Sequence, residues 1–140
     1  MAISTEDLRA VRQSFDKLRY ELSVHSDYFY DTLFRRAPQF RAMFRDDLAG
    51  QGMKFMTTLD VILNKLEHEE EMAEQFQGLG RKHASLGVEA SHFVPMEEAL
   101  MDTLRVALGE GFTPVLETAW RKAYGQVSEN MIRRGGMAQG

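Results

Sequence analysis

Apolar residues recur along this chain at intervals of three and four positions, which is the repeat of one face of an α-helix. The first such segment covers residues 4–21. Ser4 is its candidate N-cap, and the apolar face follows at Leu8, Val11, Phe15 and Leu18. Because the spacing is helical rather than that of strands, the pattern predicts helices and no strand.

Polar, proline and glycine residues separate the following segments. Ser26 and Asp27 start the second segment, and Pro38 either ends it or opens a short new turn, because proline cannot donate the interior hydrogen bond of a helix. A third helix begins at Gln51, and the helix after it is expected to stop near Gly87.

The last two helices carry start and stop residues of their own. These markers are Ser91 and Pro95, then Gly109, then the pair Thr113 and Pro114, and finally Gly135 and Gly136. Together the segments predict an all-α fold of six or seven helices in one domain, residues 1–140, in which the last few residues are expected to fray.

Composition narrows the class of protein further. Of the 140 residues, 44% are hydrophobic, which suits a globular domain with a core large enough to enclose a ligand. The net charge of −4 offers no basic excess for nucleic acid or anionic lipid. Cysteine is absent, so thiolate chemistry and disulfides are excluded. With no long apolar run, we expect a cytoplasmic protein without a nucleic-acid or membrane partner.

One histidine stands apart from the other three. His83 continues the apolar stripe of Met72, Phe76 and Leu79, and a histidine on such a stripe must satisfy two ring nitrogens. From spacing alone, a core histidine bonded to backbone is the favoured interpretation, and an axial metal ligand is the alternative. The other histidines are expected in a turn (His25), on the surface amid carboxylates (His68), and as a local hydrogen-bonding residue at a helix start (His92).

Two polar residues lie close to apolar stripes. Tyr30 sits in an aromatic-rich segment and is, taken alone, a core tyrosine. Gln51 heads a helical stripe and, taken alone, is an exposed polar residue at a helix start. The acidic run 67–71 is expected to be a solvated face rather than a metal site, because consecutive residues project around a helix.

Taken together, these residues resemble a bacterial single-domain globin, of the branch that also supplies the haem domain of flavohaemoglobins. The resemblance spans roughly residues 5–132, in order and at family spacing. The matching pieces are Tyr28-Phe-Tyr-Asp-Thr-Leu-Phe34, Pro38, Phe44, Gln51-Gly-Met-Lys-Phe55, Gly80-Arg-Lys-His83, Gly87-Val88 and Trp120-Arg-Lys-Ala-Tyr124-Gly125. This ordered set reverses the preference for a purely structural His83.

The resemblance implies a globin fold, with helices packed three-on-three around a haem b. His83 matches the proximal iron ligand, and Tyr30 and Gln51 match the distal pair that faces a bound gas. The iron would keep its sixth position open, because no histidine stands at position 51. The further residues expected to contact the cofactor are Phe44, Lys54 (toward a propionate), Phe55, Val88 and Phe93.

The sequence departs from the flavohaemoglobin pattern at two positions. Where that family has a proximal tyrosine and a glutamate near the end of the last helix, this chain has Phe93 and Gly135. The hydrogen-bond network that makes the histidine more electron-donating is therefore expected to be missing. The sequence ends at Gly140 without a flavin domain, so any catalytic cycle would use an external reductase.

Three functions are compatible with this pattern. The leading expectation is reversible binding of oxygen, and of nitric oxide or carbon monoxide, at a five-coordinate haem iron. The alternative is a nitric oxide dioxygenase that depends on a separate reductase. The third is a signalling or structural globin-fold protein, with or without haem. His83 argues against the version without haem.

Overall fold

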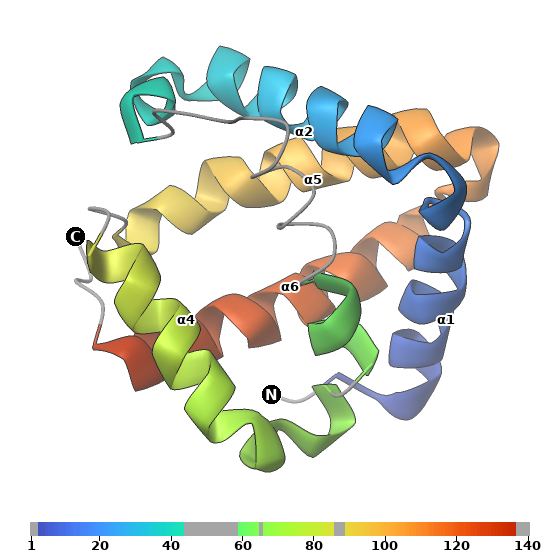
Figure 1. Ribbon diagram of the computed structural model, residues 1–140. Coiled ribbons are helices and arrows are strands. Elements are labelled where there is room, and N and C mark those ends of the chain that lie inside the picture. The colour runs from blue at the N-terminus through green and yellow to red at the C-terminus, as the bar shows by residue number, and fades with distance from the viewer. Residues whose placement is uncertain (1–2, 44–58, 65, 86–88, 137–140) are drawn as a thin grey trace.

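The computed structural model describes residues 3–43, 59–64, 66–85 and 89–136, and every regular element in these ranges is helical (Figure 1). Residues 59–64 are also helical. The elements are α1 (Thr5–Asp16), η1 (Arg19–Glu21), α2 (Leu22–Arg36), η2 (Pro38–Met43), η3 (Leu66–Met72), α4 (Ala73–Ser85), η4 (Ala90–His92), α5 (Phe93–Leu108), η5 (Gly109–Gly111) and α6 (Pro114–Gly135), where η marks a 3-10 helix. The predicted all-α class is confirmed.

Capping side chains set several of the helix ends where the sequence predicts them. The Ser4 hydroxyl accepts a hydrogen bond from the Asp7 N–H at 3.1 Å and opens α1. The Thr113 hydroxyl accepts from the Leu116 N–H at 3.2 Å and opens α6. α5 ends at Leu108, and its C-cap residue Gly109 has φ 57°, a backbone conformation that favours glycine.

Two predicted boundaries are wrong. The first helix ends at Asp16 rather than near residue 21, although Leu18 is still buried in the turn that follows, where its N–H donates to the Phe15 carbonyl at 2.9 Å. α2 begins at Leu22, four residues before the predicted start at Ser26. Its N-cap residue, Glu21, makes no side-chain capping bond, so this start carries no sequence signal.

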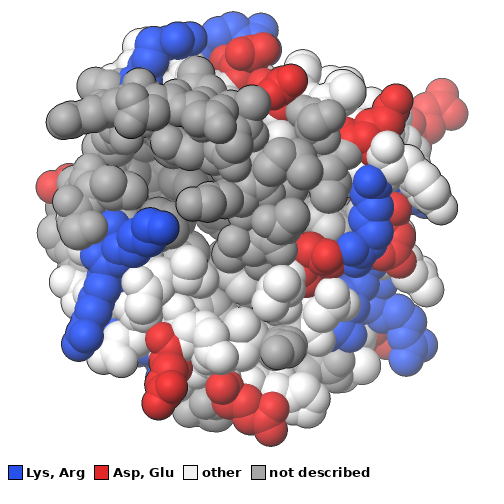
Figure 2. All heavy atoms as spheres, in the orientation of Figure 1, with Lys and Arg blue, Asp and Glu red and all other residues white. Residues whose placement is uncertain are grey.

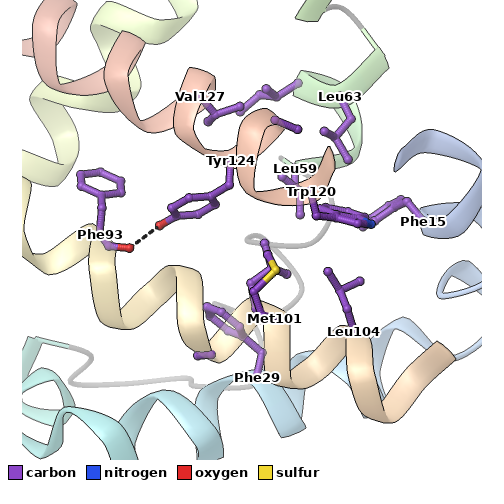
Figure 3. Packing of buried hydrophobic residues seen from close by; sticks show 14 of the residues in the cluster. Phe15, Phe29, Leu59, Leu63, Phe93, Met101, Leu104, Trp120, Tyr124 and Val127 are labelled. Atoms are coloured by element: carbon purple, nitrogen blue, oxygen red, sulfur yellow. Dashed lines mark hydrogen bonds between the residues drawn. The ribbon is translucent and has the colours of Figure 1, made fainter. Parts of the chain in front are cut away.

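The helices pack in pairs that cross the molecule. α2 lies along α5, whereas α4 and α1 both pack against α6 (Figure 1). The buried side chains between them are mostly aliphatic and aromatic, and Figure 3 shows them converging from α1, α5 and α6. Trp120 of α6 is 1% exposed, and its Nε1–H donates to the Ser14 hydroxyl of α1 at 2.8 Å. Trp120 therefore ties α6 to α1 inside the core.

Candidate functional site

Tyr30 lies on the buried face of α2. Its side chain is 7% exposed, with the ring of Phe29 edge-on at 5.0 Å between centroids and the ring of Phe34 at 5.9 Å. Burial disfavours the phenolate and raises the pKa of Tyr30 to about 12. The hydroxyl therefore remains protonated at neutral pH, as a hydrogen-bond donor must.

The helix that carries His83 is α4. The stripe predicted to lead to this residue is buried at Met72, which is 3% exposed, and at Phe76, which is fully buried, and Leu79 is partly buried against the core. The backbone of His83 belongs to the last turns of α4, and its side chain lies outside the described part of the chain. Its role as an iron ligand therefore stays a prediction.

The first residues of α5 and the residue before them contact both α6 and η2. Phe93 is 5% exposed, and its backbone carbonyl accepts a hydrogen bond from the Tyr124 hydroxyl of α6 at 3.1 Å (Figure 3). Burial, reinforced by the charge of Glu97, raises the pKa of Tyr124, so this hydroxyl also stays protonated. One residue earlier, the His92 ring meets the ring of Phe40 in η2 edge-on at 5.0 Å.

His92 behaves as its position predicts. Its Nδ1 accepts a hydrogen bond from the Glu89 N–H at 3.0 Å, which closes a capping box at the start of η4. His68 is exposed, also as expected, and lies in η3 at a kink with φ −115° and ψ 48°. The expected place of His25 is wrong: this residue lies inside α2 and is partly buried, because α2 begins before it.

Gly135 lies where α6 crosses α4. A Cβ atom built on Gly135 would lie 2.5 Å from the Cα of Gly80 and 2.9 Å from the backbone N of Arg81, well inside van der Waals contact. A glutamate side chain therefore has no room here with the two helices at this spacing. The structure thus gives a physical reason for the glycine that the sequence places at this position.

The remaining expected contacts of the cofactor lie outside the described residues: Phe44, Gln51, Lys54, Phe55 and Val88. Within the described ranges, the expected site residues belong to three helices. Tyr30 is on α2, which packs on α5, and Phe93 begins α5. Tyr124 connects Phe93 to α6, on which α4 and the backbone of His83 are packed.

Sequence reasoning missed the two connections that join these helices. Tyr124 belongs to a motif shared with globins, but nothing in its neighbourhood along the chain indicates a bond to the Phe93 carbonyl, 31 residues away. Gly80 stands in the Gly80-Arg-Lys-His83 motif without an assigned role. An isolated glycine inside a helical pattern was the available signal, since it weakens the helix and is kept for packing or function.

Charged side chains form a network on the outside of α5 and α6. The Arg121 guanidinium donates to Glu97 and Glu98, each at 2.6 Å, and to Glu117 at 2.9 Å. The hydrogen bonds from Arg121 lower the pKa values of Glu98 and Glu117 below their usual range. On the face shown in Figure 2, both signs of charge are scattered among the described residues. Among these residues, no helix is both long and apolar enough to span a membrane.

Comparison with solved structures identifies the fold. A carbene transferase, engineered from a Rhodothermus marinus protein that is named for nitric oxide dioxygenase activity, superposes with a TM-score of 0.85. The match covers 96% of this chain and 94% of that protein at 24% sequence identity. The two proteins therefore share one fold.

Comparison of sequences identifies the family. The sequence model of the Globin family matches residues 27–131. Neuroglobin from Tetraodon nigroviridis is 26% identical over 94% of this chain and 91% of its own length. A flavohemoprotein from Bordetella pertussis is 28% identical over 94% of this chain, which spans only 34% of that relative. The chain belongs to the globin family, and its fold is the globin fold.

Proposed function

We propose that this globin holds a haem b through His83 and reversibly binds a diatomic gas, foremost oxygen, beside the hydroxyl of Tyr30. Membership of the globin family supports the cofactor in general terms. The placement of Tyr30 is the observation that carries the gas-binding part: a buried hydroxyl, protonated at neutral pH, on the helix where the family resemblance expects the distal donor.

The described residues suit a haem. An apolar, aromatic environment with few polar groups is typical of a cofactor site, and Phe29, Phe34 and Phe93 are all buried. Histidine is the nitrogen ligand that haem iron takes in globins. When bound, the haem would supply an iron atom with one position open to a gas molecule. His83 would hold the group, and Tyr30 would donate a hydrogen bond to the gas.

The contribution of Tyr30 follows from hydrogen-bond energetics. A bound oxygen molecule carries partial negative charge, and hydrogen bonds to charged groups contribute about 1.5–3 kcal/mol. Since 1.36 kcal/mol corresponds to a factor of ten in rate, Tyr30→Phe is expected to speed oxygen dissociation by about 10–100-fold. Stopped-flow dissociation measurements test this. An unchanged rate would remove Tyr30 from the gas site.

The assignment of His83 has its own test. Stoichiometric haem uptake by the wild type, lost or spectrally shifted in His83→Ala, is the expected result. Haem uptake with an identical spectrum in the variant would remove His83 as the ligand. No uptake by the wild type would leave the third function, a signalling or structural protein without haem.

A second candidate function is nitric oxide dioxygenation with electrons from an external reductase. It is supported by the 28% identity to a flavohemoprotein and by the fold shared with a protein named for this activity. Multiple turnovers of nitrate formation with a cellular reductase are the discriminating measurement. A single turnover per protein molecule would favour the binding function, because any globin carrying oxygen can react once with nitric oxide.

A further inference from the structure

α4 and α6 touch through backbone at one point of their crossing. A Cβ atom added to Gly80 would lie 2.8 Å from the Cα of Gly135 and still closer to the carbonyl oxygen of Met131. A Cβ atom added to Gly135 would lie 2.5 Å from the Cα and 2.6 Å from the carbonyl carbon of Gly80. All of these neighbours are backbone atoms, so no flexible side chain can yield.

Glycine is required at positions 80 and 135 because a side chain would clash there, and not because of the backbone dihedral angles. Within the described ranges, positive φ angles occur only at Gly109 and Gly136, so Gly80 and Gly135 have dihedral angles that other residues also adopt. Carbon atoms in ordinary contact lie about 3.5–4.0 Å apart, so a methyl group at either position would separate the two helices by about 1 Å.

α6 is packed against α1 as well as against α4. The indole of Trp120 is hydrogen-bonded to Ser14 of α1 at 2.8 Å. A forced separation at the two glycines therefore shifts the C-terminal part of α4 relative to the pair formed by α1 and α6.

That part of α4 includes the backbone of His83. Three residues along an α-helix correspond to about 4.5 Å, less than one turn, so Gly80 and His83 move together as a rigid unit. A displacement of about 1 Å at Gly80 is therefore carried almost fully to the Cα atom of His83.

We propose that Gly80 and Gly135 are positioning residues for the cofactor: their backbone contact sets the place of the His83 backbone and thereby the bond between this residue and the haem iron. The proposal rests on the function proposed above. According to this proposal, the packing of α4 on α6 affects the bond between His83 and the iron, although the two glycines would bind neither the cofactor nor the gas.

The chain offers matched controls for both positions. Gly78 lies on α4 and Gly125 on α6, and a Cβ atom at either one meets nothing within 4 Å. Gly78→Ala and Gly125→Ala therefore add the same methyl group and the same gain in helix propensity as Gly80→Ala and Gly135→Ala, without the clash.

The iron–histidine stretching vibration of the ferrous protein, recorded by resonance Raman spectroscopy, is the decisive readout. We expect its frequency to shift in Gly80→Ala and Gly135→Ala and to stay at the wild-type value in the two control variants. Haem affinity is expected to fall by about 10–100-fold in the same two variants, as it does when the support of a metal ligand is lost.

An iron ligand that is not attached to α4 can show whether Gly135→Ala acts through the position of His83 or through a general change of the haem pocket. In His83→Gly, free imidazole can take the place of the side chain without being tied to α4. Adding Gly135→Ala to this background should leave the iron–imidazole vibration unchanged. A shift of equal size with free imidazole would overturn the proposal, because the effect would then not pass through the backbone of His83.

The remaining outcomes are equally distinct. A wild-type vibrational frequency in Gly80→Ala and Gly135→Ala would overturn the proposal, even if both variants were less stable. Failure of both variants to fold would assign the contact a purely structural role and would also overturn it. Failure of the wild type to bind haem, or an iron–histidine vibration that survives His83→Ala, would instead contradict the proposed function itself.

Discussion

Replacing Tyr30 with phenylalanine is expected to remove part of the sensitivity of the fold to alkaline pH. Burial raises the pKa of Tyr30 to about 12 in the folded protein, whereas an unfolded chain holds its tyrosines near 10. Between these two values the unfolded state loses the phenolic proton first. The stabilising contribution of protonated Tyr30 is therefore fully present below about pH 10. It is lost as the pH rises through the pKa of Tyr30 in the folded protein.

The size of the effect follows from the two pKa values. Each pKa unit corresponds to 1.36 kcal/mol, so a difference of about two units amounts to about 2–3 kcal/mol in the free energy of unfolding. The advantage of the wild type over Tyr30→Phe should therefore shrink by about this amount between about pH 10 and about pH 12. Other groups that titrate in this range are shared by both proteins and cancel in the comparison.

Urea unfolding followed by far-ultraviolet circular dichroism, in steps from about pH 8 to about pH 12, measures this difference. Tyr20→Phe is the matched control, because the Tyr20 side chain is 91% exposed and does not gain exposure on unfolding. A difference between wild type and Tyr30→Phe that stays constant over the whole range would refute the reasoning. The same result would contradict the burial of the Tyr30 hydroxyl in the folded protein.

Two further predictions concern bonds within the fold. Trp120→Phe should lower the free energy of unfolding by about 1–3 kcal/mol, because it removes a buried hydrogen bond and leaves a small void. In urea unfolding, a double-mutant cycle with Ser14→Ala should show that the two effects are coupled rather than additive. Arg121→Met should cost about 1 kcal/mol near neutral pH. Since the pKa values of Glu98 and Glu117 are lowered in the fold, thermal unfolding at decreasing pH should show this cost vanishing as the pH falls through them, whereas a cost independent of pH would exclude the ion pairs as its cause.

Helix ends were predictable wherever the signal is local. Ser4, Thr113 and Gly109 act on backbone groups within a few residues, so their identity and position along the chain were sufficient. The start of α2 has no such residue: Glu21 forms no side-chain cap. Nearby, Arg19 forms an ion pair with Asp60, a contact between residues 41 positions apart that no local pattern indicates.

The features of the candidate site also divide into those that local sequence predicts and those that depend on how the helices cross. The burial of Tyr30 and the apolar stripe leading along α4 were predictable, because helical spacing alone places these residues on covered faces. The contact between Gly80 and Gly135 was not, since it depends on where two helices cross, and their glycines are 55 positions apart in the sequence. The hydrogen bond from Tyr124 to the Phe93 carbonyl likewise exists only once α5 and α6 have met.

Gln126 has a consequence for the order in which the chain folds. Its side-chain oxygen accepts from the Ile3 N–H at 2.9 Å, and its amide nitrogen donates to the Leu66 carbonyl at 3.4 Å, so one residue of α6 joins partners 123 and 60 positions away. Contacts of such separation close large loops, which costs chain entropy before the contacts can stabilise the fold. We therefore expect the two hydrogen bonds of Gln126 to form late in folding. Bonds formed late lower the unfolding rate and leave the folding rate nearly unchanged.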